Sequence, residues 1–155
     1  MAMSAEGTSE RMIVVGVDGS KSSSGALEWA AGEARMRGAT LKVVRAWRVP
    51  VLAYGPYVSP PPPSDFKKNA EALLDEQINR VLGPNPGVTV VRELAEGAAA
   101  EVILMASAGA EMIVIGSRGL GGFGGLLLGS VGAQVAHHAR CPVTIWRGGQ
   151  GGTAG

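Results

Sequence analysis

Short, almost unbroken apolar runs constrain the fold of this chain more than any other feature of its sequence. Residues 12–17 (MIVVGV) and 112–115 (MIVI) contain no polar side chain. A strand buried on both faces has this pattern, which is typical of parallel sheets. Residues 41–47, 88–91 and 143–146 are further strand candidates. The sequence therefore predicts a sheet that is covered on both of its sides.

Segments with helical periodicity separate these strands. The first has an apolar stripe made of Leu27, Ala30, Ala31 and Ala34. The second has a wider stripe, made of Ala70, Leu73, Leu74, Ile78 and Val81. Gly38 is placed to end the first helix, and Ser64 can cap the second. Two shorter helices are predicted at about residues 99–106 and 130–138.

Strands that alternate with helices imply βαβ units with right-handed crossovers. The expected fold class is therefore α/β, a single domain built on an open parallel sheet with helices on both faces. Its 155 residues suit one domain. We expect residues 1–10 and 148–155 to be disordered, and residues 49–63, which include four consecutive prolines, to form an extended surface loop.

Composition narrows the class of partner and the compartment. The formal net charge is +1, so there is no electrostatic reason to expect nucleic acid or an anionic membrane as a partner. The apolar region 98–115 is broken by Glu101 and Glu111, and no run is long enough to span a bilayer. The single cysteine fits a reducing compartment, and the first residues do not have the pattern of a signal peptide. We therefore expect a cytoplasmic protein.

A long glycine-rich loop follows the fourth predicted strand. Residues 116–130 read GSRGLGGFGGLLLGS, and seven of these fifteen residues are glycine. Glycine lets the backbone approach a bulky anion, and the loop ends at a helix start, where free N–H groups favour negative charge. These features indicate a phosphate cradle, although a flexible linker of small residues would have a similar composition. The GxxxxGK[ST] motif is absent, as is GxGxxG from the turn after the first strand.

The chain resembles the universal stress protein family over about residues 11–147. The spacing Gly116-x2-Gly119-x9-Gly129-Ser130 matches the ATP-binding signature of that family, and the opening MIVVGVDGS and the RMRGA turn before the second strand are similar too. The resemblance implies a Rossmann-like, adenine nucleotide alpha hydrolase-like sheet of five parallel strands in the order 3-2-1-4-5. That order puts the first and fourth strands side by side where the strand order reverses.

The resemblance also implies roles for individual residues. The phosphates of ATP would be held by Gly116, Gly119, Gly129 and Ser130. Asp18 would lie near the ribose or near a phosphate-bound Mg or Mn ion, although it could instead cap the first helix or stabilise its turn. Ala46 would offer backbone groups to the adenine, and Val131 would contact a phosphate through its amide. Arg118 is a candidate phosphate contact, with solvent exposure as the alternative.

These residues predict a binding module rather than a dedicated enzyme. The sequence has no Ser-His-Asp set, no metal cluster and no lysine in the glycine loop. Nucleotide occupancy would then regulate a protein partner that the sequence does not identify, with hydrolysis slow. The alternatives are a slow ATPase or nucleotidyl-transfer enzyme that uses Asp18 and a divalent metal, and a module that binds cyclic AMP. The resemblance further implies a homodimer through the last strand, residues 143–146.

Overall fold

A computed structural model of the chain describes residues 10–50, 55–119 and 128–148. The elements in this part of the chain, in order, are β1 (Met12–Gly16), α1 (Lys21–Arg37), β2 (Thr40–Trp47), α2 (Pro63–Leu82), β3 (Val90–Glu96), α3 (Ala99–Ala106), β4 (Met112–Gly116), α4 (Ser130–His138) and β5 (Val143–Trp146). Strands and helices alternate along the chain, as the apolar pattern predicts.

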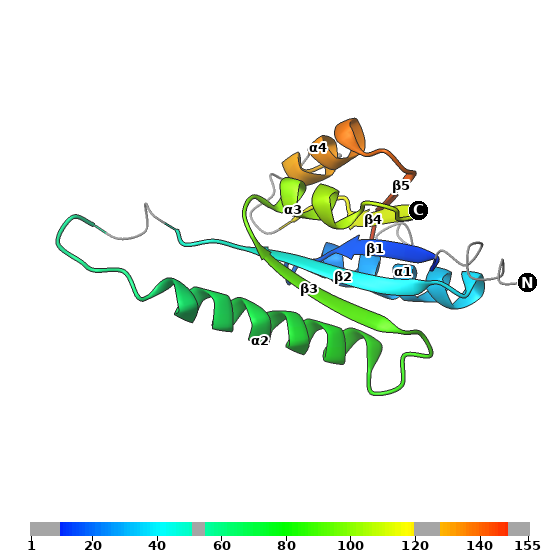
Figure 1. Ribbon diagram of the computed structural model, residues 1–155, viewed down its shortest axis with the longest axis horizontal. Coiled ribbons are helices and arrows are strands. Elements are labelled where there is room, and N and C mark those ends of the chain that lie inside the picture. Colours follow the sequence, from blue (N-terminus) through cyan, green and yellow to red (C-terminus); the bar gives the residue numbers. More distant parts are fainter. Residues whose placement is uncertain (1–9, 51–54, 120–127, 149–155) are drawn as a thin grey trace, which may run out of the picture.

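The strands form one sheet in the order β3-β2-β1-β4-β5, and every neighbouring pair is parallel. Helices α1 and α2 cover one face of this sheet, and α3 and α4 cover the other (Figure 1). The fold class and the strand order expected from the sequence and its family resemblance are therefore confirmed.

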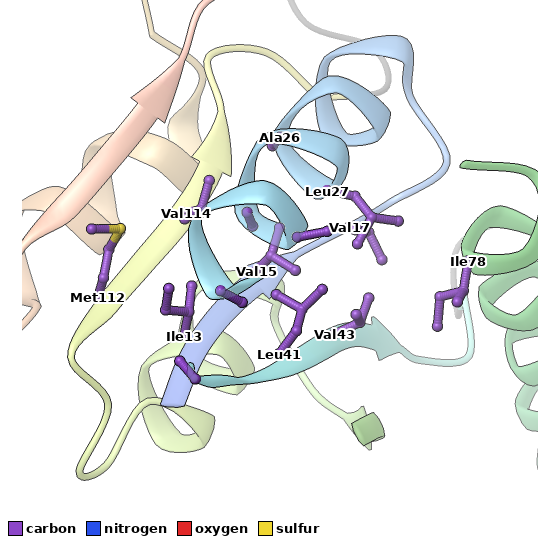
Figure 2. Close-up of a cluster of buried hydrophobic side chains, with 14 of the residues drawn as sticks. Ile13, Val15, Val17, Ala26, Leu27, Leu41, Val43, Ile78, Met112 and Val114 are labelled. Atoms are coloured by element: carbon purple, nitrogen blue, oxygen red, sulfur yellow. The ribbon is translucent and has the colours of Figure 1, made fainter. Parts of the chain in front are cut away.

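Strand β1 explains why the apolar runs are unbroken. Ile13 and Val15 belong to the core beneath α1 and α2, whereas Val14 belongs to the core beneath α3 and α4, and all three are fully buried. Figure 2 shows the first of these cores, where Leu41 and Val43 of β2 pack beside β1. Successive side chains of a central strand thus enter two different cores, so neither face of the strand can be polar.

Two glycines in helices behave as their positions in the sequence suggest. Gly38 ends α1 in the left-handed conformation, with φ 64° and ψ 33°, as predicted. Gly132 lies inside α4, where a glycine costs about 1 kcal/mol relative to alanine. A Cβ atom at this position would lie 2.6 Å from Cδ1 of Leu128 and 3.5 Å from Cδ1 of Ile115. Close packing of the Leu128 side chain over residue 132 therefore accounts for the glycine, whereas the distance to Ile115 of the sheet is an ordinary contact.

The third strand differs from its prediction over residues 88–91. Strand β3 runs from Val90 to Glu96 and pairs with β2 along its whole length. The prediction ended too early because Arg92 and Glu93 interrupt the apolar pattern. Both side chains form ion pairs, Arg92 with Asp75 of α2 and Glu93 with Lys42 of β2. Charged residues are common on an edge strand, where one side of the strand is open to water.

The second helix also begins and packs differently from the prediction. It starts at Pro63 with Pro62 as its N-cap, so Ser64 is inside the helix and makes no capping hydrogen bond. Proline favours the first helical position because its missing N–H is not needed there. Leu73 is 42% exposed, whereas Gln77, a polar residue, is fully buried. The buried stripe of α2 is therefore narrower than expected and includes an amide side chain.

The segment that precedes α2 extends away from the sheet (Figure 1). Residues 55–62 are exposed and form neither helix nor strand, as expected for the proline-rich loop, while residues 51–54 lie outside the described ranges. The sequence predicts disorder for residues 1–10 and 148–155. Within these two segments, residues 1–9 and 149–155 also lie outside the described ranges. That part of the prediction remains untested.

An ionic cluster joins three elements at the amino edge of the sheet. The carboxylate of Glu111 lies 2.6 Å from Nε of Arg11 and 3.2 Å from Nη1 of Arg37. Arg37 also approaches Glu33 one turn earlier in α1, at 3.8 Å. Because Arg11 precedes β1 and Glu111 precedes β4, the cluster ties the starts of both strands to the end of α1.

We expect this cluster to make stability depend on pH at the acidic end. The hydrogen bond from Arg11 is the main cause that lowers the pKa of Glu111 below its ordinary value of 4.5, and Arg37 lowers it further. A carboxylate with a lowered pKa in the folded state stabilises the fold above its unfolded pKa, and this contribution is lost as the pH falls through the folded pKa. The thermal unfolding midpoint of wild type should therefore drop more steeply below about pH 4.5 than that of Glu111→Gln. Parallel pH profiles of the two proteins would contradict this assignment.

Candidate functional site

The carboxyl ends of β1 and β4 meet where the strand order of the sheet reverses. The chain leaves β1 for β2 on one side, and leaves β4 for β5 on the other. Ligands of open parallel sheets bind in the crevice that forms at such a point. The turn after β1 and the glycine-rich loop after β4 both begin there, as the sequence predicts.

The turn after β1 is held by hydrogen bonds between neighbouring residues. The backbone N–H of Ser20 donates to Oδ1 of Asp18 at 2.9 Å, and the N–H of Asp18 donates to Oγ of Ser23 at 3.2 Å. Ser20 is the N-cap of α1 and accepts from the N–H of Ser23 at 3.1 Å. Asp18 therefore stabilises the turn, and the cap of the helix is Ser20.

The second carboxylate oxygen of Asp18 lies against the glycine loop. A Cβ atom built on Gly119 would be 2.7 Å from Oδ2 of Asp18. Real Cβ atoms essentially never come within 3.0 Å of another heavy atom, so a side chain at this position would collide with the carboxylate. The close approach favours glycine at residue 119, because a side chain there would displace the Asp18 carboxylate, and it brings a charged group of the turn after β1 to the loop that follows β4.

The two ends of the glycine loop meet and form a neck, which we define as residues 116–119 together with 129–130. The N–H of Gly129 donates to the carbonyl oxygen of Ser117 at 2.8 Å. The neck also contacts α1, because the N–H of Arg118 donates to Oγ of Ser22 at 3.3 Å. Residues 120–127, the predicted middle of the phosphate cradle, lie outside the described ranges.

The other residues predicted for the site take several positions. Ser130 is the first residue of α4 and is exposed, while Gly129 is the N-cap of that helix. Val131 follows, and its side chain packs into the core beneath α3 and α4, which leaves its role to the backbone amide. Arg118 is exposed. Ala46 lies near the end of β2, at the same edge of the sheet but one strand away from β1.

Gln77 of α2 is a residue of this site that the sequence does not reveal. Its Oε1 accepts from the N–H of Gly19 at 3.0 Å, and its Nε2 donates to Oγ of Ser23 and Oγ of Ser24, each at 3.0 Å. It thus fixes the Asp18 turn from a helix more than fifty residues away. The available signal in the sequence was a polar residue between Leu74 and Ile78 of the buried stripe. This signal alone does not show which part of the chain Gln77 contacts.

Replacing Gln77 with leucine should weaken the fold at this turn. The N–H of Gly19 would lose its acceptor, and the hydroxyls of the buried Ser23 and of Ser24 would lose a donor, so we expect the free energy of unfolding to fall by about 1–3 kcal/mol. Urea denaturation measures this change. Asn79→Leu is the matched control, because Asn79 is an exposed polar residue of the same helix and its replacement should change stability by less than about 0.5 kcal/mol. Equal effects of the two substitutions would refute the role of Gln77.

Arg45 of β2 is a second such residue. It follows Leu41 and Val43 on the face of β2 that enters the core beneath α1 and α2. Its Nη1 atom is buried, and no hydrogen-bond acceptor for it exists within the described part of the chain. Burial lowers the pKa of the guanidinium, and the charge of Asp18 raises it. The signal in the sequence was that arginine follows Leu41 and Val43 in the alternation of the strand, at a position where an apolar side chain is expected.

The described residues contain no group of three or more histidine, cysteine, aspartate or glutamate side chains arranged to hold a metal ion. They also contain no helix that is long and apolar enough to cross a membrane. The described residues bring backbone amides, the Asp18 carboxylate and the Arg45 guanidinium to the reversal point, and the amides and the guanidinium suit recognition of an anionic ligand.

Comparison with known proteins agrees with this geometry. The sequence matches the profile of the universal stress protein family over residues 10–147. The chain belongs to the universal stress protein family. A relative from Mycolicibacterium smegmatis, itself named a universal stress protein, is 33% identical over 149 residues, which cover 92% of this chain and 50% of that protein. This universal stress protein thus spans about half the length of the curated relatives that it matches.

Two solved structures of the family contain adenine nucleotides. A universal stress protein in complex with cAMP is 28% identical, with a TM-score of 0.65 over 87% of this chain and 95% of that one. A universal stress protein from Archaeoglobus fulgidus in complex with dAMP is 25% identical, with a TM-score of 0.59 over 87% of this chain and 96% of that one. Nucleotide binding is thus found among proteins that share the fold of this universal stress protein.

Proposed function

We propose that this universal stress protein binds an adenine nucleotide, namely ATP, at the neck of the glycine loop. The observation that carries the proposal is the approach of Gly119 to the Asp18 carboxylate at the reversal point of the sheet, where a Cβ atom at residue 119 would lie 2.7 Å from Oδ2 of Asp18. The two family members with bound cAMP and dAMP support an adenine nucleotide as the ligand.

In this proposal the phosphates interact with backbone amides of the neck. Gly116, Gly119, Gly129 and the start of α4 at Ser130 and Val131 supply these amides, and the helix terminus favours the negative charge. Asp18 is an acceptor for the ribose hydroxyls or for a phosphate-bound Mg or Mn ion, because a carboxylate is a ligand that these cations prefer. Ala46 offers its backbone to the adenine, and Arg118 is in reach of solvent-exposed phosphate oxygens.

We further propose that the protein is a regulatory module, and that ATP hydrolysis is slow. Rapid phosphoryl transfer needs a placed base and neutralising cations. His137 and His138, the two histidines, are exposed in the last turn of α4, at the end away from the neck. A turnover number of several per second would favour the alternative, an enzyme that uses Asp18 and a divalent metal.

The edge strand β5 supports a homodimer as the form in which the module acts. It pairs with β4 on one side, and an edge strand leaves backbone groups on its other side without sheet partners. Antiparallel pairing of residues 143–146 with a second copy would use these groups and create a two-fold axis. Sedimentation at micromolar concentration tests this, and a monomer would exclude it. We place the dimer in the cytoplasm, consistent with the single cysteine.

Nucleotide binding can be tested on the purified protein in two ways. Mass spectrometry after denaturation should detect ATP carried through purification. Calorimetric titration with ATP, with and without Mg, should give a dissociation constant in the micromolar range or below, about −8 kcal/mol or stronger. Titration with cAMP distinguishes the alternative ligand, because tighter binding of cAMP than ATP would reassign the site. Absence of binding by every adenine nucleotide would refute the proposed function.

A further inference from the structure

One nitrogen of the half-buried Arg45 side chain, Nη1, is unusual for a charged group beside the candidate site. Nη1 is shielded from solvent and finds no hydrogen-bond acceptor among the residues that the structure describes. It lies beside Gly19, since a Cβ atom built on that glycine would be 3.5 Å away. Buried polar groups nearly always have partners, so an unpartnered donor next to a binding site calls for an acceptor that a ligand can supply.

The order of the strands indicates which part of a nucleotide could reach this donor. The proposed adenine contact, Ala46, is on β2, and the glycine neck follows β4. Strand β1 lies between β2 and β4, and Gly19 belongs to the turn after β1. A nucleotide with its base at β2 and its last phosphates at the neck would therefore have the phosphate nearest the ribose above β1, where Arg45 meets Gly19.

The charges at the site also favour a contact between Arg45 and the phosphate nearest the ribose. The Asp18 carboxylate lies against Gly119 of the neck, and it would repel a phosphate that enters there. Arg45 is close enough to Asp18 for the two charges to interact. A guanidinium matches the geometry of phosphate oxygens and binds them with strong, charge-assisted hydrogen bonds. Arg45 can thus offset the repulsion between the Asp18 carboxylate and a phosphate, and it can also donate hydrogen bonds to the phosphate directly.

We propose that Arg45 binds the phosphate nearest the ribose and so makes the site selective for nucleotides over nucleosides. This inference rests on the proposed function, and it adds a binding residue from β2 to a site otherwise made by the loops after β1 and β4. The contact would complete the hydrogen bonding of Nη1 when a nucleotide is bound. Because the first phosphate is common to AMP and ATP, Arg45 should strengthen the binding of both.

The test compares adenosine, AMP and ATP by calorimetric titration. We expect wild type to bind AMP more tightly than adenosine. In Arg45→Met the affinities for AMP and ATP should fall by about tenfold or more, which is the usual worth of a hydrogen bond to a charged group. The affinity for adenosine should stay within about twofold of wild type, because adenosine has no phosphate for Arg45 to bind. Arg80→Met is the matched control, since Arg80 is an exposed arginine on α2 that pairs with Glu76.

The following results would refute the role of Arg45. The titration of wild type shows whether this inference fails alone or together with the proposed function. Unchanged AMP and ATP binding in Arg45→Met, or an equal loss for adenosine, would show that Arg45 does not bind the phosphate. Arg45→Gln keeps a polar side chain of similar shape without the charge and covers the case in which Arg45→Met does not fold; unchanged AMP affinity in this variant would also refute the contact. Wild type that binds AMP no better than adenosine overturns the inference alone, whereas wild type that binds no adenine nucleotide overturns the proposed function.

Discussion

The Gly119→Asp variant should lose nucleotide binding, with an ATP affinity at least about 100-fold below that of wild type. The new side chain would begin 2.7 Å from Oδ2 of Asp18 and so cannot be placed without displacing the Asp18 carboxylate. It would also add a second carboxylate at the point where we expect phosphates, and like charges in close contact cost several kcal/mol. Calorimetric titration with ATP measures the effect directly.

A matched substitution separates this local effect from a general one. Gly32→Asp makes the same chemical change on α1, where a built Cβ would meet only Nη2 of Arg35, at 3.9 Å. We expect this control to bind ATP as wild type does. Circular dichroism should show that Gly119→Asp is folded, since residue 119 is exposed and outside the core. A folded Gly119→Asp protein that binds ATP with wild-type affinity would remove the glycine neck from the site.

The fold could be predicted from the sequence because its strongest signals are local. An unbroken run such as residues 12–17 shows that a strand enters two cores, whatever the identity of its neighbours. The strand order came from the family resemblance and not from the pattern itself, since periodicity does not say which strands pair. The limits of β3 were missed for a related reason, because they are set by pairing with β2, which the charged residues Arg92 and Glu93 do not reveal.

The candidate site could be predicted only where its residues follow a strand directly. Asp18 and Gly119 are each next to a strand end, so the rule for parallel sheets brings them together. Gln77 and Arg45 reach the same turn from α2 and β2, and their roles depend on how those elements pack. No spacing along the chain encodes such a contact. A polar side chain at a buried position was the available signal, and it indicates a partner without naming it.

Gly116→Ala should destabilise the fold strongly, although this glycine belongs to the proposed phosphate-binding signature. A Cβ atom at residue 116 would overlap Oγ of Ser22 and would lie 2.7 Å and 2.8 Å from the backbone C and O atoms of that serine. The backbone of α1 cannot move away without leaving the sheet, so we expect a loss of about 3 kcal/mol, at the upper end for overpacked sites. The thermal unfolding midpoint should fall by roughly 6–12 °C.

Two further variants identify the cause of that loss. Gly32→Ala, on the open side of α1, should stabilise the protein by about 0.5–1 kcal/mol, because alanine is the better helix former. Adding Ser22→Ala to Gly116→Ala removes the hydroxyl but leaves the backbone atoms of residue 22 in place, so stability should not recover. Recovery would instead show that the hydroxyl alone sets the limit. If the double variant stays unstable, glycine is required at residue 116 for α1 to pack on β4, and that packing is what holds the Asp18 turn beside the glycine neck.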